Sequence, residues 1–172
     1  MMKTAVETSD GARTRPCPIL VLGVGNLLLR DEGVGVHVAQ TMQRMKLPET
    51  VEAVDGATAG FDLLDIIADR RKVIVVDAMD GDYPPGTVVR LTLEDLAAGN
   101  GQASSLHRLG LAEVLGLAGR LGVAPAELVI LGVKAANLEY GLELSPELDR
   151  LLPRIVELVL NEIDGHKGED WS

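Results

Sequence analysis

Three residues of metal-binding type stand at points where strands and helices of this chain are expected to meet. Glu32 follows a glycine-rich turn, Asp77 ends an apolar run, and His107 stands at the start of a helical pattern. Two carboxylates and one imidazole form a ligand set for a borderline divalent ion, with one position left open for water or substrate. The sequence therefore predicts a candidate metal site whose residues lie far apart along the chain.

The strand that leads into Glu32 is expected over residues 19–23, where an apolar run ends in glycine. Apolar residues then recur three and four positions apart, which predicts a helix over 32–46 with Asp31 and Glu32 at its first turn. Ligands of open α/β sheets bind at the carboxyl ends of strands, so both carboxylates are expected at that edge. The dipole at a helix start favours ionised Glu32 and neutral His107, which are the metal-binding forms.

The remaining chain alternates between strand and helix patterns. Strands are expected over 51–55, 73–77, 87–93 and 128–133, and helices over 61–68, from Ser104 or Ser105 to about Leu121, and from Pro146 to about Ile163. This alternation predicts an α/β fold with a mostly parallel sheet, right-handed crossovers and helices on both faces. The segment from Thr87 is expected to add an antiparallel strand. One domain is expected over residues 1–172, with an ordered core over 18–164 and tails over 1–16 and 165–172.

Composition limits the classes of partner. The net charge of −10 and the sequence pI of about 4.7 argue against nucleic acid as a partner. Cys17 is the single cysteine, so no internal disulfide can form, which is typical of a reducing compartment. Residues 1–16 lack the apolar region of a signal peptide, and no apolar run approaches the length of a membrane span. We therefore expect a cytoplasmic protein without a membrane partner.

Each candidate residue also has an ordinary structural interpretation. Asp31 and Glu32 could complement a helix dipole, Asp77 could cap a turn, and His107 could be a solvated residue at a helix start. Asp55 ends the second expected strand, where it could either cap the following turn or contact substrate. Structural roles are expected for Cys17, for His37 at the surface or core edge, for His166 in the tail, and for Ser104 and Ser105 as helix caps.

Nucleotide binding is the alternative interpretation of the glycine-rich turn. Gly23 and Gly25 match the start of a dinucleotide fingerprint, and Asp55 could be its acidic residue. However, Leu28 stands where the third glycine belongs, and the acidic pair at positions 31 and 32 would repel a pyrophosphate. This class predicts thermal stabilisation of the protein by a dinucleotide.

Five segments, in order, carry a resemblance to a known family. They are Gly23–Gly35, Asp55–Gly60, Val75–Ala78, Ser105–Leu111, and Gly132-Val133 followed by Glu139–Pro146. Together they resemble the motifs of the hydrogenase maturation proteases, endopeptidases that trim the C-terminus of the nickel-iron hydrogenase large subunit. The resemblance extends over residues 19–163, nearly the whole chain.

The resemblance implies a fold, a site and a reaction. The fold is a three-layer α/β/α sandwich around a mostly parallel, twisted sheet. Glu32, Asp77 and His107 correspond to the family's metal-contacting residues, and Asp55 is a candidate helper. The reaction is removal of a C-terminal peptide from the large-subunit precursor after nickel insertion. Nickel is expected to be supplied by that precursor, and another divalent ion can occupy the same site in vitro.

Several alternatives remain open at this stage. The ligand set fits a protease that holds its own metal as well as one that contacts the nickel of its precursor. A non-catalytic assembly factor that recognises nickel-loaded precursor is the alternative function, and a monomer is the expected state. Ala57 departs from the family's usual Asp-Gly-Gly-Thr turn, and Tyr140 stands where the family often has tryptophan.

Overall fold

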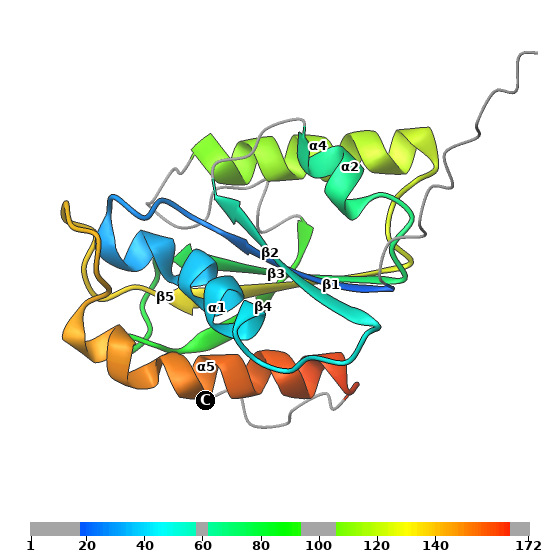
Figure 1. Cartoon of the computed structure of the whole chain (residues 1–172). Helices are drawn as coiled ribbons and strands as arrows, with labels where there is room; N and C mark the ends of the chain where they lie inside the picture. Colours follow the sequence, from blue (N-terminus) through cyan, green and yellow to red (C-terminus); the bar gives the residue numbers. More distant parts are fainter. Residues whose placement is uncertain (1–17, 58–61, 94–105, 166–172) are drawn as a thin grey trace, which may run out of the picture.

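A five-stranded sheet forms the centre of the molecule (Figure 1). The computed structural model describes residues 18–57, 62–93 and 106–165. The strands are β1 (Ile19–Val24), β2 (Val51–Ala57), β3 (Lys72–Met79), β4 (Val88–Leu91) and β5 (Glu127–Lys134), in the spatial order β2-β1-β3-β5-β4. The helices are the 3-10 turn η1 (Arg30–Gly33), α1 (Val34–Gln43), α2 (Asp62–Ile67), α4 (Leu106–Leu121) and α5 (Pro146–Ile163).

Helices cover both faces of the sheet. Helices α1 and α5 pack on one face, and α2 and α4 pack on the other (Figure 1). Strands β1, β2, β3 and β5 run parallel, and β4 pairs antiparallel with β5, with Val88 opposite Val133. The predicted three-layer α/β/α architecture and the antiparallel strand after Thr87 are therefore confirmed.

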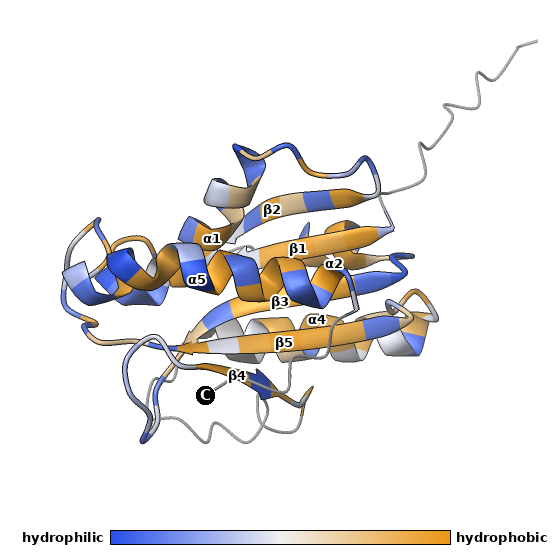
Figure 2. Ribbon diagram, turned by 90° about the horizontal axis from the view of Figure 1, so that it is seen from below, coloured by the Kyte–Doolittle hydropathy of each residue, from blue (hydrophilic) through white to orange (hydrophobic). Residues whose placement is uncertain are grey.

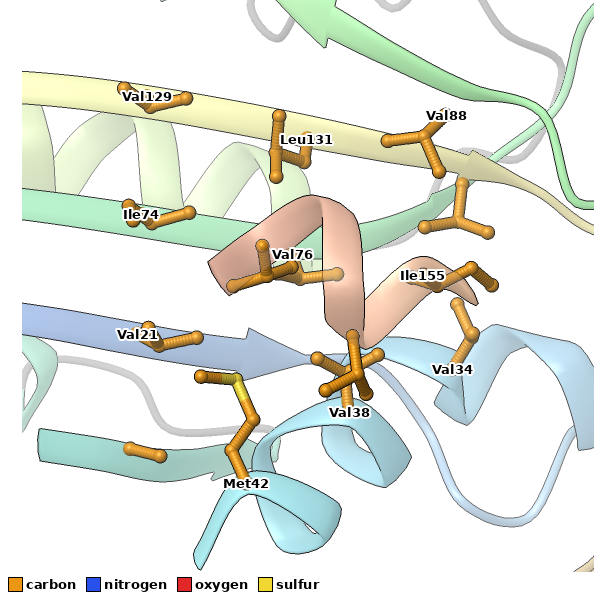
Figure 3. Close-up of a cluster of buried hydrophobic side chains, with 14 of the residues drawn as sticks. Val21, Val34, Val38, Met42, Ile74, Val76, Val88, Val129, Leu131 and Ile155 are labelled. Atoms are coloured by element: carbon orange, nitrogen blue, oxygen red, sulfur yellow. The ribbon is translucent and has the colours of Figure 1, made fainter. Parts of the chain in front are cut away.

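Strands β1 and β3 are buried along their whole length, because helices cover both of their faces (Figure 2). Alternate residues of each strand contribute to different halves of the core. Val21 and Ile74 face α1 and α5, as Figure 3 shows, whereas Leu22 and Val75 face α2 and α4. Full burial of each such side chain stabilises the folded state by about 1.5–3 kcal/mol relative to an exposed one. The core thus consists of two layers of mostly aliphatic side chains, one on each face of the sheet.

The start of the first helix differs from the prediction. The α-helix begins at Val34 and ends at Gln43, instead of extending over 32–46. Asp31 and Glu32 lie in the preceding 3-10 turn, which begins at Arg30 with its positive φ of 45°. A short-range apolar spacing cannot detect this turn, because the contacts that hold it come from distant residues.

Asp77 was predicted to end its strand, and this boundary is wrong. Strand β3 continues to Met79, because the pairing with β5 continues to the Met79–Lys134 pair. Strand β2 also continues past its predicted end at Asp55, and Ala57 pairs with Val24. Ala57 is thus in extended backbone, which alanine adopts without strain.

Several predictions fall on residues outside the described ranges. These concern Cys17, Ser104, Ser105, His166, the turn after Ala57 and both tails. The single-domain organisation over 1–172 also stays a prediction. Within the described ranges, no helix is both long enough and apolar enough to cross a lipid bilayer.

Candidate active site

Two glycines bring the turn after β1 close to the end of the sheet. A Cβ atom on Gly25, whose φ is 142°, would lie 1.9 Å from the carbonyl oxygen of Glu32. A Cβ atom on Gly35 would lie 2.1 Å from the carbonyl oxygen of Val76. Only glycine fits such approaches, so these positions allow η1 and the start of α1 to pack against β3. Glu32 is consequently held at the carboxyl edge of the sheet, three residues before the close contact between Gly35 and Val76.

Asp31 joins the turn after β1 to the loop after β5. Its carboxylate is fully buried and accepts hydrogen bonds from Ala136 N (2.9 Å), Asn137 N (2.7 Å), Ser145 N (2.7 Å) and Ser145 Oγ (2.9 Å). The same Ser145 hydroxyl caps α5 by accepting from Leu148 N at 3.3 Å. Hydrogen bonds to an ionised carboxylate are among the strong ones in proteins. Asp31 therefore ties the turn that carries the neighbouring Glu32 to the loop after β5.

Glu32 itself has an unsatisfied oxygen. Its Oε2 is buried and has no hydrogen-bond partner among the described residues, although the side chain as a whole is only partly buried. A buried carboxylate oxygen without a partner is costly, and natural structures rarely keep one without a reason. A cation that binds this oxygen would supply the missing interaction.

Asp77 lies on the face of the sheet that α4 covers. Asp77 is 3% exposed. It stands two residues after Val75 in β3, so both side chains are on the same face of the sheet, and Val75 packs in the layer beneath α2 and α4. Helix α4 begins at this same edge of the sheet (Figure 1). His107 is the second residue of α4, and its side chain lies outside the described part of the chain. The backbone thus places Asp77 and the first turn of α4 on one face, with Glu32 at the same edge.

Asp55 lies on the opposite face of the sheet. Asp55 stands two residues after Ala53 in β2, so both side chains are on the same face, and Ala53 packs in the layer beneath α1 and α5. The Oδ2 of Asp55 accepts from Gln40 Nε2 of α1 at 3.0 Å. The structure therefore separates Asp55 from Asp77 by the thickness of the sheet and connects it to α1.

His37 is a further polar group near this end of the core. Its Nε2 is buried without a hydrogen-bond partner among the described residues. Burial lowers the pKa of His37 below 6.5, and Asp149 and the backbone of Leu142 oppose that shift. The sequence placed His37 at the surface or core edge, and the structure confirms the core edge.

Sequence reasoning missed the role of the loop after β5. Three of its backbone N–H groups bind Asp31, and Gly141 pairs with Leu29. No group of three or more metal-binding side chains occurs among the residues whose side chains the structure describes, a set that does not contain His107. The metal-contacting role of Glu32, Asp77 and His107 therefore stays a prediction.

Comparison with known proteins places this geometry in a family. The family model described as hydrogenase maturation protease matches residues 36–162. The hydrogenase 2 maturation protease of Escherichia coli K12 is 40% identical over 83% of this chain and 88% of its own length. The hydrogenase expression/formation protein HupD of Thiocapsa roseopersicina is 37% identical over 83% of this chain and 66% of its own length.

A solved structure shares the fold. The hydrogenase maturating endopeptidase HybD from Escherichia coli is 38% identical, with a TM-score of 0.77 over 87% of this chain and 93% of that one. The matched lengths and identities are too extensive for a shared fold alone. This chain belongs to the hydrogenase maturation protease family and is a peptidase.

Proposed function

We propose that the chain removes a C-terminal peptide from a nickel-iron hydrogenase large-subunit precursor after nickel has been inserted. The observation that carries this proposal is the buried Glu32 Oε2, which has no hydrogen-bond partner among the described residues and lies at the same edge of the sheet as Asp77 and the start of α4. The similarity to the hydrogenase 2 maturation protease of Escherichia coli K12 supports a hydrogenase as the substrate.

The three predicted residues contact nickel that the precursor carries. Glu32 and Asp77 supply carboxylate oxygens and His107 supplies an imidazole nitrogen, a donor set that suits a borderline divalent ion. Water adds to the scissile carbonyl carbon, the C–N bond breaks, and the leaving nitrogen takes up a proton. Asp55 lies on the other face of the sheet, where its Oδ2 accepts from Gln40 Nε2, and its predicted role as a helper stays a prediction.

Nickel then acts as a checkpoint for the reaction. Binding energy that depends on the ion distinguishes a loaded precursor from an empty one, so only the loaded form is cut. We further propose a cytoplasmic monomer that binds neither membrane nor nucleic acid. The single cysteine and the net charge of −10 support this assignment.

The test is a mass measurement on the precursor. Nickel-loaded precursor is incubated with the wild-type protein and with His107→Ala, and its mass is recorded before and after. We expect the wild type to release a C-terminal peptide and His107→Ala to leave the precursor intact while keeping the wild-type melting temperature. A folded His107→Ala protein with full activity would remove His107 from the site.

A second result would change the function class. If the wild type binds the loaded precursor and never changes its mass, the chain is an assembly factor. If dialysis of the protease against a chelator abolishes cleavage of loaded precursor, and added divalent ion restores it, the metal belongs to the protease.

A further inference from the structure

An exposed apolar patch lies beside the candidate active site. It consists of Leu28 (60% exposed), Leu138 (40%), Tyr140 (87%) and Leu142 (68%), which we name the apical patch. Large apolar side chains that gather at one place on a surface mark interaction sites more often than isolated ones do. None of these four residues has a role in the metal-contacting set.

The two loops that carry the patch are joined by their backbones. Gly141 N donates to Leu28 O at 2.9 Å, and Arg30 N donates to Gly141 O at 2.9 Å. Figures 1 and 2 both show the two loops side by side at one end of the molecule, beyond the carboxyl ends of the strands. The buried Asp31 carboxylate ties the same loops together a second time. The patch is consequently preorganised, which lowers the cost of ordering on binding.

The patch is continuous with the candidate active site. Leu28 stands four residues before Glu32 on one short turn, and Glu32 N donates to the carbonyl oxygen of Leu29 at 3.0 Å. A folded protein that places its scissile bond at Glu32 must therefore cover the surface next to it. Tyrosine is also enriched among the residues that dominate binding energy at protein interfaces.

Charge around the patch distinguishes between two possible occupants. Glu139 and Glu143 are exposed and flank Tyr140 and Leu142, and the single cation beside Gly141 among the described residues is Arg30, so the surroundings of the patch are acidic on balance. A symmetric dimer through this surface would bring these carboxylates towards their copies, in a chain whose net charge is −10. A partner with an apolar centre and a basic rim has no such repulsion.

We infer that the apical patch docks the folded body of the large-subunit precursor, through an apolar surface with basic residues at its rim. This inference rests on the proposed function, because it takes the precursor as the substrate. Docking beside the cleavage site provides affinity that does not depend on the nickel contact. The patch thus contributes to recognition of the protein, and Glu32, Asp77 and His107 to recognition of its metal.

The experiment compares two substituted proteins with the wild type. The test protein carries Tyr140→Ser and Leu142→Ser, and the control carries Leu121→Ser. Leu121 is a matched control because it is 59% exposed and ends α4 at the opposite edge of the sheet. Binding to immobilised nickel-loaded precursor gives Kd, and precursor mass against time gives kcat and KM. Sedimentation of each protein alone gives its oligomeric state.

We expect the test protein to bind at least about tenfold more weakly, with KM raised equally and kcat retained, and the control to match the wild type. Equal Kd values for the test protein and the wild type would overturn the inference, as would a wild type that binds no precursor. Self-association lost in the test protein, with precursor affinity unchanged, would assign the patch to a second copy. A wild type that binds without cleaving contradicts only the proposed protease function, because the Kd ratio still tests the patch.

Discussion

The sheet holds buried carboxylates in different ways at the amino and at the carboxyl ends of its parallel strands, which we call the amino edge and the carboxyl edge. At the amino edge, Glu162 Oε1 accepts from Lys72 Nζ at 2.9 Å and from Arg90 at 2.8 Å, so two cations offset its charge. At the carboxyl edge, Asp31 is satisfied by four hydrogen bonds, whereas Glu32 Oε2 has no partner among the described residues. Glu162 Oε2 also has no hydrogen-bond partner in the described part of the chain, but its carboxylate is already paired with Lys72 and Arg90.

The difference indicates two uses of buried charge. The amino edge carries its compensating cations within the chain, so its carboxylate stabilises the fold. The carboxyl edge holds one carboxylate rigidly and leaves its neighbour available to a cation from outside. The predictions below test this division, beginning with the largest expected effect.

Removing the carboxylate at the amino edge should destabilise the fold strongly. Glu162→Ala removes one of the two carboxylates that pair with the buried Lys72 ammonium and leaves it only the half-exposed Glu127, whose Oε1 is 3.2 Å away. We expect the free energy of unfolding in denaturant to fall by about 1.5–3 kcal/mol. In Glu162→Leu, adding Lys72→Met should recover part of the loss, because the uncompensated charge is then gone.

The kcat of the folded fraction should stay at the wild-type value in these amino-edge variants. A marked decrease in kcat would show that this edge also contributes to the reaction.

Removing the charge of Glu32 should lower the rate of cleavage and leave the stability of the fold unchanged. Glu32→Gln keeps the shape of the side chain but weakens it as a metal ligand, so we expect cleavage to slow by about 10²-fold or more. The melting temperature should stay close to that of the wild type, because Oε2 makes no hydrogen bond within the described residues. Precursor mass against time measures the first effect and thermal unfolding the second.

Glu113→Gln, on the exposed surface of α4, is the matched control for the loss of one carboxylate. Wild-type cleavage by a folded Glu32→Gln protein would exclude Glu32 from the site.

Asp31→Asn tests the neighbouring carboxylate. An amide has only one acceptor oxygen, so it cannot satisfy donors on both Oδ1 and Oδ2, and its NH2 group faces a backbone N–H. We expect a loss of about 2–3 kcal/mol in the free energy of unfolding, measured by denaturant titration. Ser145→Ala keeps the backbone donors and should cost only about 1 kcal/mol through the lost cap. Equal costs for the two variants would contradict the assignment of Asp31 as the link between the loops.

His37 should produce the smallest effect, a weak pH dependence of stability. Burial lowers its pKa in the folded state, so the unfolded chain binds more protons as the pH falls through 6.5. Stability is therefore full above that pH and declines below it. Unfolding of the wild type and His37→Gln at about pH 7.5 and pH 5.5 measures the difference. A decline of the same size in both proteins would assign the pH dependence to other groups.

The sequence predicted the layers of this fold because they depend on local patterns. The β-branched run Val73–Val76 and the Ser145-Pro146 helix start are both readable within a few residues, and both are confirmed. The start of α1 was wrong because Asp31 is held by residues 105 to 114 positions away. No local spacing contains that information.

The candidate site was also predictable only where local patterns determine the positions of its residues. The order of strands and helices predicted Glu32 and Asp77 near one edge of the sheet, and the backbone places both there, although β3 continues two residues past Asp77. The alternation of β2 and its contact with Gln40 separate Asp55 from them, which required the register of the sheet. The apical patch could not be predicted, because backbone hydrogen bonds between residues about 110 positions apart bring the loops of Leu28 and Tyr140 together.

The most direct test of the division between the two edges is the nickel dependence of cleavage. Nickel-loaded and nickel-free precursor are each incubated with metal-free wild type, Glu32→Gln and Glu162→Gln, and the precursor mass is followed. We predict that the wild type and the folded fraction of Glu162→Gln cut only the loaded precursor, and that Glu32→Gln cuts neither form. Equal cleavage of loaded and empty precursor by the wild type would contradict the claim that the carboxyl edge awaits an external cation.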